Sequence, residues 1–157
     1  MNLPISSILL PVAHVPQRRY GDCLVACASM VLTYLGRPMP YNRLVKTLRI
    51  QPGVGATFSN VEALARLNIA VIYEQGVLLD LHRFLINGWP CIVPVKSGEL
   101  PYWENIDTDH AVVVVGMEAA SIYLNDPAFA TAPFQVSLGD FDLAWFERDQ
   151  VYAVLAP

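Results

Sequence analysis

The sequence has few charged residues, no basic cluster and no long apolar run, and each shortage excludes a class of protein. Only 15% of its 157 residues are charged, the formal net charge is −4, and the basic residues form no group larger than the pair Arg18 and Arg19. A protein that binds nucleic acid needs more cationic side chains together, because they displace the counterions of the phosphates. The apolar runs at 24–35 and 111–115 are shorter than the roughly 18 to 20 residues of a transmembrane helix. We therefore expect no nucleic-acid partner and no membrane span.

Cysteine is also scarce, and its pattern does not indicate disulfide bonds. The chain has three cysteines, an odd number, and Cys23 and Cys27 have the i,i+4 spacing of one helix face. We expect no bridge between these two, a core position for Cys27 and Cys91, and a reducing, cytoplasmic setting. The N-terminal segment 1–16 has an apolar patch without a basic residue before it, so it is a poor signal peptide and export is the alternative.

Apolar side chains, in contrast, are abundant and make up 54% of the sequence. A chain of this length buries roughly two-thirds of its unfolded surface as one domain, so the excess predicts a thick core or a covered interface. Helical patterns dominate residues 1–88 and strand patterns dominate residues 89–157. Helices followed by strands predict an α+β fold with an antiparallel sheet rather than alternating βαβ units. We expect a single domain over 1–157 with one mainly helical and one mainly β lobe.

The individual elements follow from the periodicity of the apolar residues and from the turn residues between them. The predicted helices cover 23–35, 41–48, 59–67, 78–88 and 139–146. The predicted strands cover 8–15, 70–75, 91–96, 110–118, 121–126, 134–138 and 151–156. The third helix carries a capping-box pattern, because Ser59 stands three residues before Glu62.

Cys23 stands where a helix begins, directly after a Gly-Asp turn. The positive end of the helix dipole and the unpaired backbone N–H groups there both favour a thiolate. A thiolate nucleophile also needs a base or imidazolium beside it and donors for the oxyanion that forms on attack. The alternatives are a buried structural cysteine or a zinc site formed with Cys27 and His110. Asp22 is expected to cap the helix rather than to act as a catalytic acid. The zinc reading does not fit the common ligand spacings, so we expect no metal and no cofactor.

His110 is the histidine best placed to serve as that base. It begins the most apolar strand pattern, and Asp126 follows just after the next strand. A tight antiparallel return would bring the two together, so that Asp126 accepts a hydrogen bond from the ring and fixes its tautomer. The alternative for Asp126 is the start of a turn before a proline, and the alternative for His110 is a bond to Asp107 or Asp109. The other histidines, His14 and His82, are expected to be structural.

Gln17 lies on the loop before the helix, and its amide could donate to an oxyanion together with the backbone N–H of Cys23. The order Gln, Cys, His, Asp resembles that of papain-like cysteine peptidases. In more detail the chain resembles the bacteriocin-processing peptidases that cut double-glycine leaders for peptide exporters, and their free-standing relatives. The residues that carry the resemblance are VPQ at 15–17, GDCLVACASM at 21–30, YLG at 34–36, DHAVVVVG at 109–116 and NDP at 125–127.

The resemblance implies a papain-like fold and a peptidase mechanism. Cys23 would be the nucleophile, His110 the general base and acid, Asp126 the residue that orients it, and Gln17 the oxyanion donor. The substrate would be a peptide or protein, and a leader peptide would carry small residues before the cleaved bond. A membrane transporter could recruit the enzyme. The 157 residues contain no transmembrane or ATPase segment of an exporter.

One departure from the family concerns the residue after the nucleophile, which is Leu24 here and usually glycine in the family. Leu24, with Trp103 and Asp109 from the polar loop before His110, is a candidate for substrate binding. Two other functions would suit the same residues. The thioester intermediate could be passed to an amine, which would make the protein an acyl or peptidyl transferase. Alternatively, the chain could be an inactive peptidase-like domain that only binds peptides.

Overall fold

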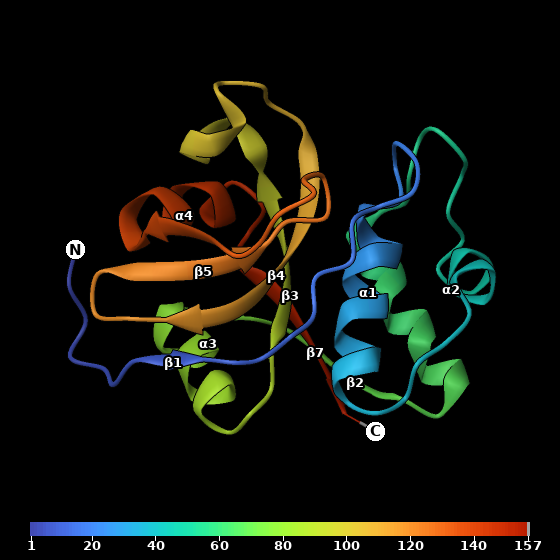
Figure 1. Cartoon of the computed structure of the whole chain (residues 1–157), viewed down its shortest axis with the longest axis horizontal. Coiled ribbons are helices and arrows are strands. Elements are labelled where there is room, and N and C mark those ends of the chain that lie inside the picture. Colours follow the sequence, from blue (N-terminus) through green and yellow to red (C-terminus); the bar gives the residue numbers. More distant parts are fainter. Residues whose placement is uncertain (157) are drawn as a thin grey trace.

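A buried helix packs against an antiparallel sheet in the middle of the folded molecule (Figure 1). The structure is a computed structural model that describes residues 1–156. Its helices are α1 (Cys23–Tyr34), α2 (Tyr41–Thr47), η1 (Phe58–Leu67), α3 (Leu78–Ile86), η2 (Ser97–Glu99), η3 (Pro101–Trp103) and α4 (Leu138–Phe146). Its strands are β1 (Ile8–Leu9), β2 (Ala70–Gln75), β3 (Cys91–Lys96), β4 (Asp109–Met117), β5 (Ser121–Asn125), β6 (Phe134–Ser137) and β7 (Val151–Ala156). The predicted α+β class is confirmed.

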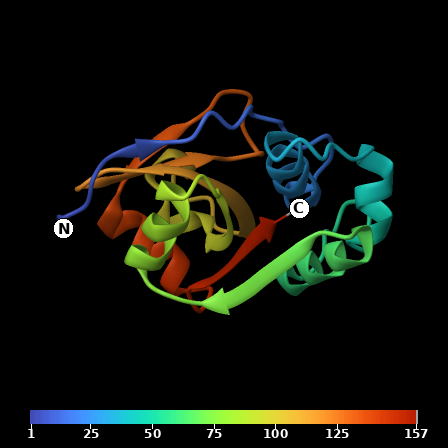
Figure 2. The ribbon, with the colours of Figure 1, turned by 90° about the horizontal axis from the view of Figure 1, so that it is seen from below.

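The sheet has seven strands in the order β2-β7-β3-β4-β5-β6, with β1 paired to β4. All pairings are antiparallel, and the strands predicted at 70–75, 91–96 and 151–156 have those bounds. Strand β4 lies in the centre and is buried from His110 to Met117, which explains its run of valines, since a strand covered on both faces has no polar side to show. Figure 2 shows α1, α2 and η1 gathered at one end of the molecule and α3 and α4 at the other.

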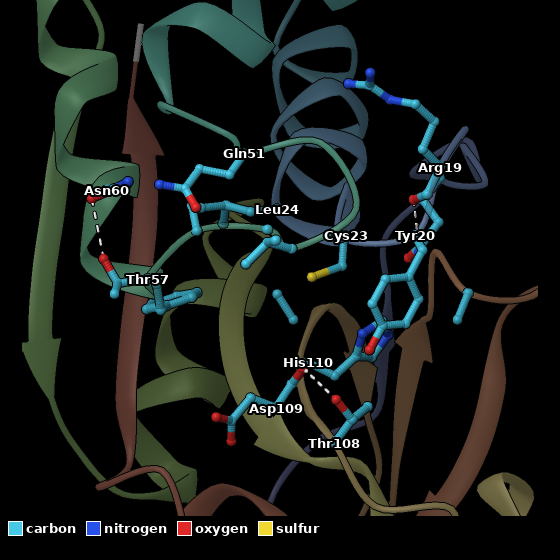
Figure 3. Close-up of a pocket in the computed structure, with 18 of the residues that line it drawn as sticks. Arg19, Tyr20, Cys23, Leu24, Gln51, Thr57, Asn60, Thr108, Asp109 and His110 are labelled. Atoms are coloured by element: carbon cyan, nitrogen blue, oxygen red, sulfur yellow. Dashed lines mark hydrogen bonds between the residues drawn. The ribbon is translucent and has the colours of Figure 1, made fainter.

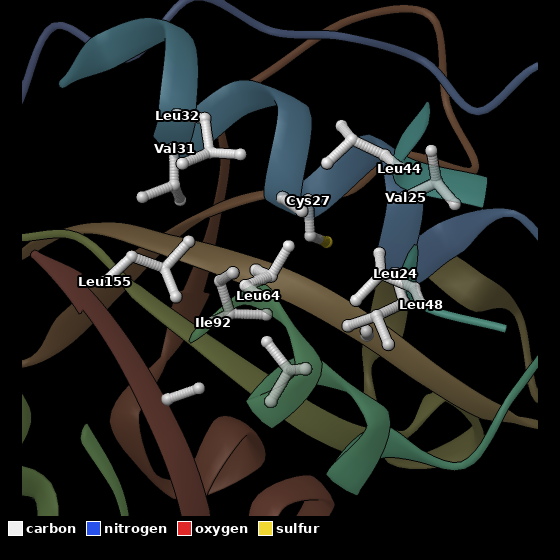
Figure 4. Packing of buried hydrophobic residues seen from close by; sticks show 14 of the residues in the cluster. Leu24, Val25, Cys27, Val31, Leu32, Leu44, Leu48, Leu64, Ile92 and Leu155 are labelled. Carbon is white, nitrogen blue, oxygen red and sulfur yellow. The ribbon is translucent and has the colours of Figure 1, made fainter. Parts of the chain in front are cut away.

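Helix α1 is apolar on all sides because the chain surrounds it. Eight of its twelve residues are buried, and side chains of α2, η1 and the sheet pack around it. Figure 4 shows Cys27 and Val31 of this helix beside Leu64 and Ile92. Cys27 and Cys91 are both fully buried, as predicted. None of the helices within residues 1–156 has the length and apolar content needed to cross a membrane.

The opening strand predicted at 8–15 is wrong beyond its first two residues. Only Ile8 and Leu9 pair with β4, opposite Met117 and Gly116. Prolines in the following segment lack the N–H that a strand ladder requires, so the chain continues there without regular pairing. It is held by single hydrogen bonds, and in one of them the side-chain amide of Asn125 donates to the Val12 carbonyl over 3.1 Å. Gly116 permits the crossing, because a Cβ there would lie 2.7 Å from the carbonyl oxygen of Ile8.

The helix predicted at 59–67 exists, but as a 3₁₀ helix that starts at Phe58 and has no capping box. Thr57 occupies the cap position without a side-chain bond to the helix backbone, and Ser59 and Glu62 are exposed. The physical reason is the spacing of the buried side chains, which are Phe58, Val61, Leu64 and Leu67. Successive members are three positions apart, which matches the three residues per turn of a 3₁₀ helix better than the 3.6 of an α-helix.

Candidate active site

Cys23 and His110 face each other at one end of the α1–sheet interface. Figure 3 shows Cys23 at the start of α1 above His110, the second residue of β4, with both residues at the edge of the same open space. Both line a cleft of about 1210 Å³ whose walls come from the segments 17–24, 49–60 and 103–111. The candidates Gln17, Leu24, Trp103 and Asp109 line the same cleft. Asp126 does not reach it and is buried behind His110.

Two glycines hold the cleft wall against the loop that carries Cys23. A Cβ on Gly21 would lie 2.7 Å from the backbone nitrogen of Gly55, and a Cβ on Gly55 would lie 3.1 Å from the carbonyl oxygen of Gly21. Both residues have positive φ, at +89° and +105°, a conformation that other residues adopt with difficulty. This close backbone contact fixes the distance between the 51–55 turn and the nucleophile loop.

The His110 ring bonds to Asp126. Its Nε2 lies 2.6 Å from Oδ1 of Asp126, so Nδ1 is the ring nitrogen left for Cys23. Asp107 and Asp109, the alternative partners, lie instead beside Lys96, whose Nζ is 3.6 and 3.3 Å from them. Asp109 is exposed on the rim, where Arg148 also lies 3.4 Å away. The antiparallel return between β4 and β5 therefore brings His110 and Asp126 together.

Asp126 also receives hydrogen bonds from two aromatic side chains, which the sequence does not predict. The hydroxyl of Tyr102 donates to Oδ2 over 2.7 Å and the indole N–H of Trp103 donates to the same oxygen over 2.9 Å. Trp103 lines the cleft and also supports the carboxylate. No spacing rule signals this contact, because the loop that carries both aromatics has no regular register with Asp126.

Gln17 is held beside the site by its backbone, whose N–H donates to the Pro127 carbonyl over 2.8 Å. Its side-chain Nε2 donates to the Arg19 carbonyl over 3.1 Å. The amide nitrogen carries two N–H groups, so one remains for a ligand in the cleft. The N–H of Cys23, in the first turn of α1, is likewise not used by the helix itself.

Asp22 does not cap α1, contrary to expectation. Its backbone, at φ −91° and ψ 14°, lacks the extended conformation of a cap residue. Its buried Oδ2 instead accepts hydrogen bonds from the Tyr41 hydroxyl at 2.7 Å and from Nε of Arg19 at 3.2 Å. Asp22 thus ties the nucleophile loop to α2.

The two other histidines take structural positions. Nε2 of His14 lies 2.7 Å from the carbonyl oxygen of Phe129, and Nε2 of His82 lies 2.8 Å from that of Ser6. Neither lines the cleft. Within residues 1–156, no three histidine, cysteine or acidic side chains are placed to hold a metal ion.

Comparison with known proteins identifies the family. The model of the Peptidase_C39 like family matches residues 9–152, which include Gln17, Cys23, His110 and Asp126. The chain belongs to this family. The C39-like family and its fold are those of cysteine peptidases, which are hydrolases. No curated protein sequence matches the chain.

Solved structures of C39 peptidases share the fold. A C39-like peptidase from Bacillus anthracis is 19% identical, with a TM-score of 0.77 over 98% of both chains. The peptidase domain of Streptococcus ComA, a bifunctional ABC transporter, is 22% identical, with a TM-score of 0.74 over 93% of this chain and 98% of that one. A double-glycine motif protease of an AMS/PCAT transporter, bound to a leader peptide, is 17% identical, with a TM-score of 0.71 over 98% and 99%.

The stability of this C39-like chain is expected to fall as the pH rises from 6.5 to 9. Burial by itself lowers the pKa of His110, but the hydrogen bond to Asp126 and the nearby Cys23 outweigh it and raise the pKa from 6.5 to about 9. The protonated ring therefore stabilises the folded state fully below pH 6.5, and this contribution is lost as the pH passes 9. The difference corresponds to roughly 3 kcal/mol.

The measurement is the free energy of unfolding against pH, in the wild type and in His110→Gln. A decline between pH 6.5 and 9 that is steeper in the wild type is expected, and parallel curves would contradict the prediction. Burial alone would raise the pKa of Asp126, but its bond to His110 and its other donors lower it. The contribution of Asp126 to stability depends on pH in the opposite direction. It is present above about pH 4 and is lost as the pH falls further.

Proposed function

We propose that this chain is an active cysteine peptidase in which Cys23 is the nucleophile, His110 the general base and acid, Asp126 the residue that orients His110, and Gln17 an oxyanion donor. The observation that carries the proposal is the 2.6 Å contact between His110 and Asp126 beside Cys23, at the wall of a cleft. A nucleophile, a base and a group that orients the base are the parts that thiol catalysis requires.

The first half of the reaction forms a thioester. The Cys23 thiolate attacks the carbonyl carbon of a peptide bond, and the resulting oxyanion accepts hydrogen bonds from the Gln17 amide and the Cys23 backbone N–H. When this intermediate collapses, the C–N bond breaks and the His110 imidazolium gives its proton to the leaving amine. The acyl part of the substrate stays on the sulfur.

The second half returns the enzyme to its starting state. Neutral His110 takes a proton from a water molecule, whose oxygen attacks the thioester carbon. The C–S bond then breaks, the carboxylic acid product leaves, and the thiolate and imidazolium are restored. Throughout, Asp126 holds the ring in one orientation and stabilises its charged form.

The proposed substrate is a peptide with small residues before the cleaved bond. Leu24 lines the cleft beside the nucleophile and is only 3% exposed, because its side chain also packs into the core. A branched side chain fixed at this point narrows the cleft next to Cys23. Two of the similar structures are peptidase domains of transporters, one of them bound to a leader peptide. A leader peptide, presented by a membrane transporter that recruits this chain, would fit such a cleft.

The proposal is tested by incubating the purified protein with a diverse peptide library that includes Gly-Gly and Gly-Ala sequences. Mass spectrometry should find cleavage after small residues, and Cys23→Ser should abolish it. Absence of cleavage anywhere in the library by the protein with intact Cys23 would refute the proposal.

The same experiment separates the two rival functions. Products that carry an added amine, and that appear only when an amine acceptor is present, would identify an acyl or peptidyl transferase. Peptides that bind without turnover would identify an inactive, peptide-binding relative.

A further inference from the structure

The carboxylate of Asp126 is surrounded by four hydrogen-bond donors, although its side chain is fully buried. Oδ1 accepts from the His110 ring at 2.6 Å and from the backbone N–H of Ala128 at 3.0 Å. Oδ2 accepts from the Tyr102 hydroxyl at 2.7 Å and from the Trp103 indole N–H at 2.9 Å. One oxygen therefore serves His110 and the other is fully occupied by two aromatic donors.

The turn that carries these donors is braced by its own hydrogen bonds. Ser97, which is buried, donates its hydroxyl to the Ile106 carbonyl and accepts the N–H of Thr108, both over 2.8 Å. The N–H of Gly98 donates to Oδ1 of Asp107 over 2.9 Å. These bonds close the loop between β3 and β4 around η3, so that Tyr102 and Trp103 are presented on a fixed turn.

Aromatic packing fixes the two rings as well. The Tyr102 ring stacks parallel to Phe134 with 3.9 Å between ring centroids. Trp103 meets the His110 ring edge to face at 4.9 Å and meets Phe129 in the same way at 5.4 Å. The indole thus contacts the imidazole directly and also contacts its partner Asp126.

We propose that Tyr102 and Trp103 are positioning residues, which hold Oδ2 of Asp126 so that Oδ1 faces His110 and the carboxylate stays ionised. The inference rests on the proposed role of His110, because an ionised Asp126 is what keeps the imidazole protonated beside Cys23. Each hydrogen bond that a carboxylate accepts from an O–H or N–H group favours its charged form. Removal of one donor leaves Oδ2 less firmly held, so that the carboxylate can turn and its bond from Oδ1 to the imidazolium weakens.

The other titratable groups near His110 should not mask the effect of these donors on its titration. Burial raises the pKa of Tyr102 well above its usual value, so its hydroxyl stays a donor. Burial likewise raises the pKa of Cys27, one turn below Cys23, so that thiol stays neutral. Asp109, next to His110 in β4, is exposed and paired with Lys96 and Arg148. Cys23 is the remaining group, and a variant without its sulfur removes its influence.

The test is an NMR titration of the histidine rings, which is practical because the chain has only three histidines. Tyr102→Phe and Trp103→Phe are each made in a Cys23→Ala background, so that no thiolate contributes. We expect the midpoint of His110 to fall by about one pH unit in each variant, because a carboxylate that can turn loses part of its charge-assisted bond to the ring. His14 and His82 should keep their midpoints.

Matched controls remove a similar donor or ring elsewhere. Tyr123→Phe deletes a hydroxyl that bonds to Glu118 at 2.7 Å, and Trp89→Phe replaces an indole that stacks on Phe84. Neither should move the His110 midpoint. In the presence of Cys23, both site variants should lower kcat for peptide cleavage by about tenfold, the rate equivalent of one pH unit. Tyr102 does not line the cleft, so Tyr102→Phe should leave KM unchanged.

An unchanged His110 midpoint in both site variants would overturn the inference. Tyr102→Phe removes a single oxygen and keeps the stack on Phe134, so it decides the matter if the tryptophan variant fails to fold. Failure of the proposed function gives a different result. In that case the His110 midpoint of otherwise unchanged protein would not differ between Cys23 and Cys23→Ala, whatever the aromatic variants do.

Discussion

Replacement of His110 with glutamine is expected to lower kcat/KM for peptide cleavage on the order of 10⁴-fold. The variant loses both the imidazolium that stabilises the thiolate and the acid that protonates the leaving amine. Glutamine is preferred to alanine because the His110 side chain is buried, with 6% of the residue exposed, and a similar volume keeps the packing. The measurement is kcat/KM at pH 7 with the best peptide of the library.

His82→Gln is the matched control for this loss. His82 is also buried, at 8% exposed, and also bonds through Nε2, to the Ser6 carbonyl at 2.8 Å. It lies on α3, away from the cleft, so its variant should keep activity within a few-fold of the wild type. Equal losses in both variants would indicate a general effect of histidine removal on folding rather than catalysis by His110.

Alkylation of the thiols gives a second measure of His110 that needs no substrate. Below pH 7, mass mapping should show Cys23 labelled much faster than Cys27 and Cys91, whose buried thiols have raised pKa values. His110→Gln should remove this advantage. Equal, slow labelling of all three cysteines in the wild type would mean that Cys23 is structural or that the site is inactive.

Much of the sheet could be predicted from the sequence because local patterns decide it. The strands at 70–75, 91–96 and 151–156 are apolar and β-branched segments between clear turn residues, and their bounds match the prediction. The opening strand was wrong because prolines, rather than hydrophobicity, decide where a ladder can continue.

The candidate site was only partly accessible to the same reasoning. His110 and Asp126 could be paired from the sequence because they lie at the two ends of one tight antiparallel return, 16 positions apart. Tyr102 could not be assigned, because its contact with Asp126 depends on how an irregular loop folds back over β4. Side chains that support a site from a loop leave no periodic signal.

Asp126→Asn is expected to lower kcat/KM on the order of 10³-fold to 10⁴-fold and to cost about 3 kcal/mol of stability at pH 6. Asparagine can serve as the third residue of the triad in papain-like proteases. The large loss expected here therefore comes from the hydrogen-bond donors that surround Asp126. Both carboxylate oxygens accept two hydrogen bonds here. The NH₂ group of an asparagine side chain can only donate, so it would face two donors without an acceptor. These would be His110 and Ala128 in one orientation and Tyr102 and Trp103 in the other.

The two aromatic donors are therefore expected to make asparagine unfavourable at position 126. In a Tyr102→Phe/Trp103→Phe background, the NH₂ group can turn toward the rings while the amide oxygen stays with His110. Asp126→Asn should then cost clearly less activity and stability than in the wild type, as a double-mutant cycle would measure. Asp142→Asn, on α4 away from the cleft, is the control and should be neutral in both backgrounds, because burial raises the pKa of that carboxyl and its charge stabilises little. Equal costs of Asp126→Asn in the two backgrounds would mean that the negative charge alone, and not the number of acceptors, is what His110 requires.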